Sequence, residues 1–107
     1  MFVYFIKAFG EKELIRIKIG SSRDPQARLR QLQTGSPVQL KLMGVVKCRS
    51  DDHAKRIENL AHNLFYKQRR RGEWFRLSAK HIGQMQSLIS RCAERESAPQ
   101  PSEVKPD

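Results

Sequence analysis

Five side chains in this sequence have the chemistry to act together on a phosphate group. Glu58 and His62 are one helical turn apart, so they project from the same face of a predicted helix. One carboxylate, with waters and a phosphate oxygen, is a common way for proteins to hold Mg²⁺. The planar guanidinium of Arg28 can donate two aligned hydrogen bonds to a phosphate. Tyr4 has a phenol with a usual pKa of about 10, a poor base unless a cation such as Lys18 favours the phenolate.

Three of these residues also have a purely structural interpretation. Glu58 could be a surface carboxylate that pairs with a nearby Arg or Lys. His62 could be a helix-packing histidine that hydrogen-bonds a neighbouring loop. Tyr4 could be a core aromatic with its hydroxyl at the edge of a sheet. The choice depends on the elements that position these side chains.

Residues 15–32 predict the strand, turn and helix that would position Lys18 and Arg28. Isoleucines alternate with polar residues or glycine over positions 15–20, which is the period of a half-buried strand. The following Asp24-Pro25 pair is typical of a helix start, because Asp caps free N–H groups and Pro suits the first helical position. Gly35 predicts the end of that helix.

Residues 2–6 are apolar on both alternating faces, which is typical of an internal strand. A hairpin loop over residues 9–13 would pair this strand with the one that follows. If the hairpin closes symmetrically, Tyr4 lies opposite Lys18, and directly opposed residues of an antiparallel pair project to the same side. We therefore expect Tyr4 and Lys18 to share a face of the sheet.

The rest of the sequence predicts one more strand, at residues 40–48, and two more helices, at 52–69 and 78–92, separated by a short extended segment at 73–77. The expected fold is an α+β domain with a small, mainly antiparallel three-stranded sheet flanked by about three helices. Residues 1–94 are expected to form this domain, and the proline-containing residues 95–107 a disordered tail. The expected core stripe of the longer helix comprises Ile57, Leu60, Ala61 and Leu64.

The chain is strongly basic, with 21 Lys and Arg against 11 Asp and Glu and a formal net charge of +10. Such a field favours a polyanionic partner, most often a nucleic acid, and aromatic residues among the cations can stack on bases. The alternatives for the positive charge are a solvated basic surface or a ribosome-type protein. Trp74 could instead be a residue of the hydrophobic core. The expected nucleic-acid-binding residues are Arg23, Arg28, Arg30, Lys67, Arg69, Arg70, Arg71, Trp74 and Arg76.

The two cysteines, Cys48 and Cys92, do not have the spacing of metal ligands. Without a signal peptide they are expected to be reduced, buried thiols in a cytoplasmic protein. No apolar run approaches the roughly 20 residues that a membrane span needs, so no membrane partner is expected.

The ordered set of residues resembles the GIY-YIG nuclease superfamily over residues 2–77. Phe2-Val3-Tyr4, Lys18-Ile19-Gly20 and Arg28 follow its frame, and Glu58 lies where the family has its metal-binding glutamate. Two further tracts are more similar to the small phage-type DNA-binding branch: Leu32-Gln33-Thr34-Gly35 and Gly72-Glu73-Trp74-Phe75.

This resemblance implies a DNA-binding domain with metal-dependent endonuclease activity, acting on duplex or branched DNA. Tyr4 would be the base, Lys18 and Arg28 a phosphate clamp, and Glu58 the ligand of Mg²⁺ or Mn²⁺. His62, one turn after Glu58, is a further catalytic candidate.

Two departures from the family favour an alternative, a non-catalytic DNA-binding module on the same fold. The second motif has Lys18 where the family has a tyrosine, and no asparagine follows Asn63 to take the place of the family's active-site asparagine. An RNA-associated basic protein is a third interpretation.

Overall fold

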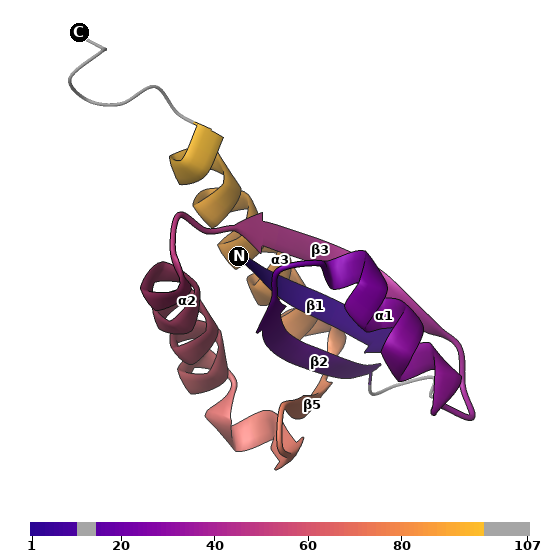
Figure 1. The fold of residues 1–107 in the computed structure, drawn as a ribbon. Coiled ribbons are helices and arrows are strands. Elements are labelled where there is room, and N and C mark those ends of the chain that lie inside the picture. Colours follow the sequence, from indigo (N-terminus) through magenta and orange to yellow (C-terminus); the bar gives the residue numbers. More distant parts are fainter. Residues whose placement is uncertain (11–14, 98–107) are drawn as a thin grey trace, which may run out of the picture.

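The computed structural model describes residues 1–10 and 15–97, with side chains as far as residue 92 (Figure 1). The last ten residues of the expected tail, 98–107, lie outside this part. The elements in chain order are β1 (Phe2–Ala8), β2 (Ile15–Ser22), α1 (Pro25–Thr34), β3 (Leu40–Lys47), α2 (Asp51–Leu64), the 3-10 turn η1 (Tyr66–Gln68), β4 (Arg69–Arg71), β5 (Trp74–Leu77) and α3 (Ala79–Ser97).

The described strands form one antiparallel sheet of five strands in the order β3-β1-β2-β5-β4. The α+β class, the antiparallel sheet and the three helices agree with the prediction, but the sheet has five strands where three were expected. The helix expected to reach residue 69 ends at Leu64, because Phe65 turns into the core and is fully buried. The three arginines that follow form β4, and Gly72 at φ +57° makes the turn into β5.

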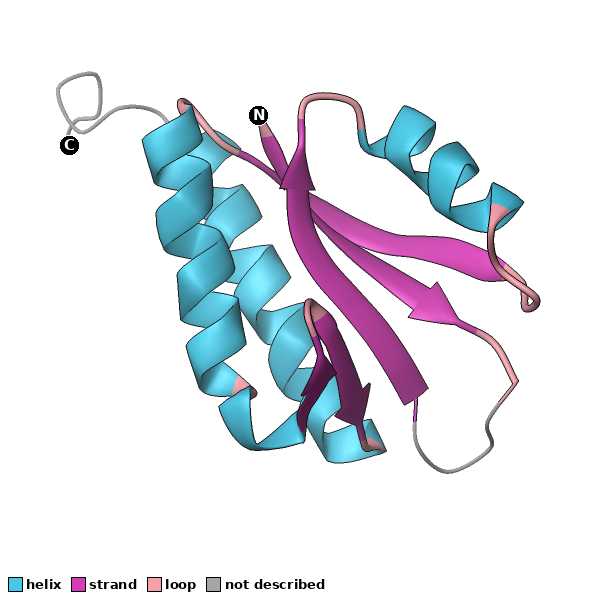
Figure 2. Cartoon of the chain, turned by 60° about the horizontal axis from the view of Figure 1, so that its bottom comes forward, coloured by secondary structure: helices cyan, strands magenta, loops and turns pink. Residues whose placement is uncertain are grey.

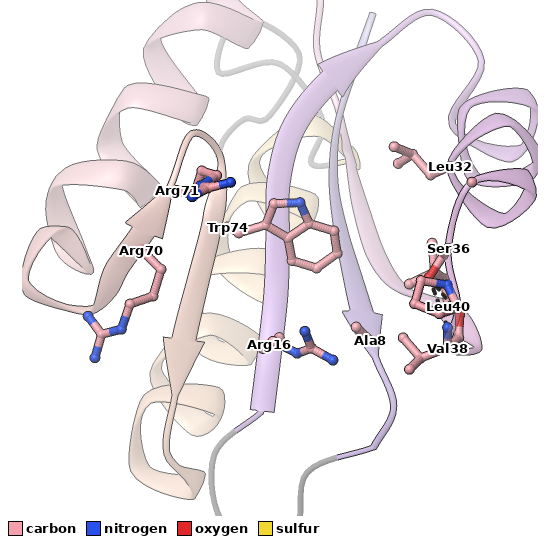
Figure 3. A pocket seen from close by; sticks show the side chains of 11 residues that line it. Ala8, Arg16, Leu32, Ser36, Val38, Leu40, Arg70, Arg71 and Trp74 are labelled. Atoms are coloured by element: carbon pink, nitrogen blue, oxygen red, sulfur yellow. Dashed lines mark hydrogen bonds between the residues drawn. The ribbon is translucent and has the colours of Figure 1, made fainter.

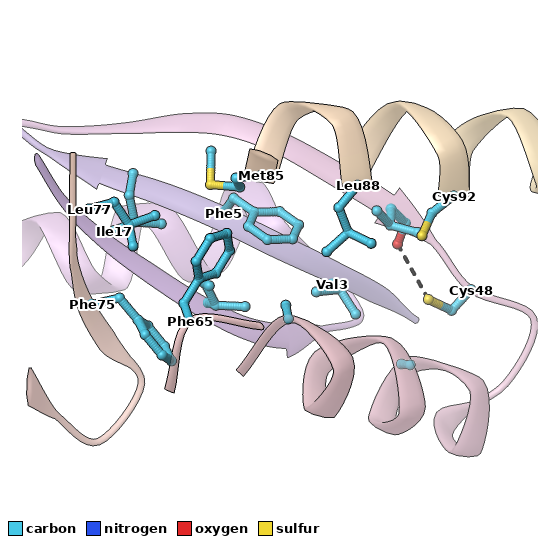
Figure 4. Close-up of a cluster of buried hydrophobic side chains, with 14 residues drawn as sticks. Val3, Phe5, Ile17, Cys48, Phe65, Phe75, Leu77, Met85, Leu88 and Cys92 are labelled. Atoms are coloured by element: carbon cyan, nitrogen blue, oxygen red, sulfur yellow. Dashed lines mark hydrogen bonds between the residues drawn. The ribbon is translucent and has the colours of Figure 1, made fainter. Parts of the chain in front are cut away.

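The helices cover the two faces of the sheet unequally (Figure 2). Helix α1 lies on one face, whereas α2 and α3 lie together on the other. The larger core is on the α2 and α3 side and includes Phe5, Ile17, Phe65, Phe75 and Met85 (Figure 4). The smaller cluster is on the α1 side, where its buried members are Tyr4, Ile6, Ala8 and Leu40.

The pairing of β1 with β2 differs from the predicted register by two residues. Tyr4 lies opposite Gly20, and Lys18 lies opposite Ile6. The prediction assumed a symmetric loop over 9–13, whereas Ala8 pairs with Arg16. Because side chains alternate with a period of two, this shift preserves the faces. Tyr4 and Lys18 still share a face, but as diagonal rather than direct neighbours.

Helix α2 is rotated relative to its predicted core stripe. Leu60 and Leu64 are 52% and 47% exposed, and the buried residues are Ala54, Glu58 and Ala61. The two small alanines allow the helix to pack closely against the sheet. This face of the helix is therefore buried, and the face with the larger leucines is exposed to solvent. The consequence for the site is that Glu58 is turned inward.

The start of α1 agrees with the prediction. The side chain of Asp24 accepts a hydrogen bond from the amide of Ala27 at 3.1 Å, and Pro25 is the first helical residue. This cap fixes the position of α1 over the sheet and thereby the position of Arg28.

The predictions for the thiols and for membrane spans can also be compared with the fold. Cys48 and Cys92 are both buried in the larger core, as expected, and the Cys48 thiol donates to the carbonyl oxygen of Val46 at 3.5 Å. Across residues 1–10 and 15–97, no helix has the length and apolar character needed to cross a membrane.

Candidate functional site

Gly20 leaves room for two side chains to meet at the edge of the sheet. A Cβ atom at this position would lie 2.6 Å from the Tyr4 hydroxyl and 2.5 Å from Oε1 of Glu73. Tyr4 reaches this point from the facing strand, and Glu73 reaches it from the turn between β4 and β5. Glycine is therefore favoured here, because a larger residue would have to displace the phenol or the carboxylate.

Arg28 is the cation that acts on Tyr4. Its side chain hydrogen-bonds the Tyr4 hydroxyl and lowers the pKa of the phenol. Burial, which is the largest cause, raises that pKa, and the negative charges of Glu73 and Glu58 raise it further. The net direction is upward from the ordinary value, so the Tyr4 hydroxyl is protonated at neutral pH.

Lys18 has a different neighbour from the one predicted. Its Nζ lies 3.3 Å from Oε1 of Glu73 and 5.7 Å from the centre of the Trp74 ring. The expected pairing of Lys18 with the Tyr4 phenolate assumed the symmetric register, which is wrong. Lys18 instead holds the carboxylate of Glu73 and packs beside Trp74.

Glu58 is held beside β2 by a bond that the next turn of α2 makes. Strand β5 pairs with β2 only as far as Lys18, and the next carbonyl, that of Ile19, accepts a hydrogen bond from Nε2 of His62 at 2.9 Å. Because a carbonyl can only accept, Nε2 of His62 must bear the proton. This bond fixes α2 against β2, and Glu58 lies one turn earlier on the same helix.

His62 therefore has the packing role that the sequence left open, although its partner is a strand carbonyl rather than a loop. Its Nε2 is 3.8 Å from Oε2 of Glu58, beyond hydrogen-bonding distance. We call Tyr4, Arg28, Glu58 and Glu73 the Gly20 cluster. Of the predicted residues, Arg28 hydrogen-bonds the Tyr4 hydroxyl, and Glu58 acts on Tyr4 through its charge, which raises the pKa of the phenol.

Glu73 was not predicted as a site residue. Arg69–Arg71 was interpreted as a helix end, so the residue after Gly72 had no assigned place near Tyr4. An isolated glycine can also mark a turn, and that interpretation of Gly72 would have placed Glu73 in a turn.

Glu58 and Glu73 have carboxylate oxygens, the type of donor that a hard divalent cation prefers. No group of three or more His, Cys, Asp or Glu that could hold a metal occurs within the described residues. Mg²⁺, however, commonly uses only one or two protein carboxylates and completes its shell with water and phosphate. Glu58 is buried, and in the described part of the chain its only ionic neighbour within 4 Å is His62. The oxygen donors of Glu58 and Glu73 are thus suitable for Mg²⁺ or Mn²⁺.

The predicted basic residues are distributed over several surfaces. Arg70 and Arg71 are exposed on β4 and line a groove with Trp74, together with Arg16, which was not predicted (Figure 3). Arg23 forms an exposed ion pair with Asp51 at 3.6 Å. The others lie outside this groove: Arg30 is exposed on α1, Lys67 lies 5.9 Å from the Tyr66 ring, Arg69 lies 6.0 Å from the Phe75 ring, and Arg76 is half-buried on β5.

Comparison with known proteins gives one match. The family model of the T5orf172 domain matches residues 1–93, which include the Gly20 cluster and the groove. No curated protein and no solved structure matches the chain. The match covers most of the sequence, so this chain belongs to the T5orf172 domain family, a phage-related family of the nuclease-associated, DNA-binding class.

Proposed function

We propose that this protein is a DNA-binding endonuclease of the GIY-YIG type that hydrolyses phosphodiester bonds with a divalent metal. The observation that supports this best is that the Tyr4 hydroxyl and the Glu73 carboxylate meet at Gly20, where Arg28 hydrogen-bonds Tyr4 and the charge of Glu58 acts on the same phenol. A phenol, a guanidinium and two carboxylates supply a water-orienting group, a phosphate ligand and metal ligands in one place.

Glu58 and Glu73 would hold Mg²⁺ or Mn²⁺. When bound, such an ion polarises the phosphate and stabilises charge on the leaving oxygen. Arg28 binds a non-bridging phosphate oxygen through its planar guanidinium. Lys18 keeps Glu73 in place through their 3.3 Å ion pair, and His62 positions Glu58 through its bond to β2.

Tyr4 orients the attacking water and takes its proton. The water oxygen forms a bond to phosphorus, and the bond to the leaving sugar oxygen breaks. The proton from the water passes through the Tyr4 oxygen to solvent, and the leaving oxygen acquires a proton from solvent. Because the phenol is protonated at neutral pH, its reactive form becomes more abundant as pH rises.

The experiment is incubation of the protein with plasmid DNA and Mg²⁺ or Mn²⁺, extended to nicked and branched DNA. Glu58→Gln should abolish cutting while DNA binding changes little, since loss of one acid does not weaken attraction to a polyanion. The matched control is Asp52→Asn, which removes an exposed acid from the same helix. Cutting by the Glu58→Gln protein would contradict the proposed role of Glu58.

The second candidate function is a DNA-binding module without cleavage, which the pairing of Lys18 with Glu73 favours. That ion pair occupies one of the two carboxylates proposed for the metal. The wild-type protein would then bind DNA, with an affinity that falls steeply as salt rises through counterion release, but would cut no form of DNA. An affinity that hardly changes with salt would contradict both candidates.

A further inference from the structure

The groove beside Trp74 has features that phosphate binding alone does not explain. It has a volume of about 460 Å³, within the range of roughly 300–1,000 Å³ that is usual for small-ligand sites. One side presents guanidinium groups, and the opposite side presents apolar side chains. Its lining contains three arginines and no acid: Ala8, Arg16, Leu32, Gly35, Ser36, Pro37, Val38, Leu40, Arg70, Arg71 and Trp74.

Trp74 lies across the middle of this groove. Figure 3 shows its indole between Arg71 on one side and the residues that follow α1 on the other, with the Arg16 guanidinium below it. The residue is only half-buried, although it packs against the smaller cluster. A half-buried indole between cations and an apolar wall presents a flat surface on which a nucleobase can stack.

The apolar wall is held in place before any ligand arrives. The hydroxyl of Ser36 donates to the carbonyl of Val38 at 2.8 Å, and Nε2 of Gln33 donates to the same carbonyl at 3.0 Å. The amide of Leu40 donates to Oε1 of Gln33 at 2.8 Å. These bonds connect the end of α1 to the start of β3, so the wall does not need to form on binding.

The groove adjoins the Gly20 cluster through Lys18. The ammonium of Lys18 contacts the Glu73 carboxylate and lies 5.7 Å from the centre of the Trp74 ring. Glu73 and Trp74 are also consecutive in the chain. A nucleotide whose phosphate is at the cluster therefore has its neighbouring base within reach of the indole.

We propose that this groove binds one unpaired, unstacked base of a DNA strand, with its phosphates on Arg70 and Arg71. Trp74 stacks on the base, the wall around Val38 excludes water from its other side, and the arginines bind the backbone. The inference rests on the proposed DNA-binding function and adds a preference for single-stranded or locally opened DNA. Stacking on an aromatic side chain does not distinguish strongly among bases, so little sequence preference is expected.

The test compares two oligonucleotides of equal length and charge, an oligothymidylate and its fully abasic counterpart. The wild-type protein should bind the oligothymidylate at least about fivefold more tightly, since stacking contributes about 1–3 kcal/mol per base. Trp74→Leu should remove most of that preference and leave the salt dependence of binding intact. Equal affinity of the wild-type protein for the two strands would overturn the proposal.

A second variant blocks the groove without touching the core. A Cβ atom at Gly35 would have no neighbour within 4 Å, and Gly35 has a φ of −95°, so Gly35→Phe can fill the groove from its wall. This change should also reduce the preference for bases. The matched control is Gly83→Phe, at an exposed position on α3 that is equally open, and it should keep the preference.

Failure of this inference can be told apart from failure of the proposed function. Salt-dependent binding without any preference for bases, or a preference that survives in both Gly35→Phe and Trp74→Leu, contradicts the base site alone. Absence of binding to either strand and to duplex DNA at low salt contradicts DNA binding itself. Arg70→Glu with Arg71→Glu should weaken both strands by similar factors, because those residues contact phosphates.

Discussion

The two faces of the sheet use alternate residues of the same strands for different purposes. The face under α2 and α3 has a continuous apolar core, in which Phe5 and Phe75 are fully buried. The face under α1 has a small cluster and, beside it, Tyr4 and Glu73 at Gly20 and the Trp74 groove, whereas Glu58 belongs to α2. We infer from this difference that the face under α2 and α3 supplies most of the free energy of folding. The face under α1 can therefore carry charged and aromatic groups.

The largest expected effect tests this division with matched leucine substitutions. Leu77→Ala should lower the free energy of unfolding by about 3–5 kcal/mol, because Leu77 is fully buried in the larger core. Leu29→Ala, at a half-buried position on α1, should cost about half as much or less. Urea denaturation measures both, and equal losses would show that the two faces contribute alike.

A smaller effect is expected where the α1 face is tightly filled. Gly20→Ala places a methyl group against the Tyr4 hydroxyl and the Glu73 carboxylate, so it should cost about 1–3 kcal/mol of unfolding free energy. Adding Tyr4→Phe removes one colliding atom, and the double variant should be more stable than the sum of the single changes predicts. Simple additivity in the denaturation curves would contradict the close contact.

The next prediction concerns the charges around Tyr4. Arg28 lowers the pKa of the Tyr4 phenol and Glu73 raises it. Arg28→Met should therefore raise that pKa further, whereas Glu73→Gln should lower it. NMR titration of the Tyr4 ring carbon measures both shifts, and shifts of the same sign would refute the assignment. Where the variants retain cleavage, the rising limb of the pH profile should move in the same directions.

The smallest expected effect is at an exposed ion pair away from both functional features. Arg23 and Asp51 are 3.6 Å apart, with side chains 81% and 68% exposed. Because solvent screens its charges, such a pair contributes less than about 1 kcal/mol to the free energy of unfolding. Arg23→Ala should therefore hardly change the denaturation midpoint. A loss comparable to that of Leu77→Ala would mean that stability is not concentrated in the larger core.

Local patterns in the sequence were sufficient to predict much of the frame. Alternation in residues 2–6 and 15–20 predicted which side chains share a face, and the Asp24-Pro25 pair predicted the start of α1. Those features depend on neighbouring residues and on steric rules that hold in any fold. They placed Tyr4 and Lys18 on the same face of the sheet, as the observed register has them.

The rest depended on contacts between distant parts of the chain. The register of β1 and β2 is set by where the hairpin closes, which the alternation does not encode. Three consecutive arginines have no period, so β4 resembled the end of a helix, and Glu73 was missed. Arg16 was also missed, because its place in the groove depends on the β4–β5 hairpin lying beside β2. The inward turn of Glu58 follows from two alanines that pack closely, whereas hydrophobicity alone favoured the leucines of α2.

The hairpin of β4 and β5 supplies groups to both functional features. Its turn provides Glu73 to the Gly20 cluster, and the adjoining residue provides Trp74 to the groove. The turn is also tied to β2, because the Ile19 amide donates to the carbonyl of Glu73 at 3.0 Å. A change in this one short segment would therefore alter the proposed metal site and the proposed base site together.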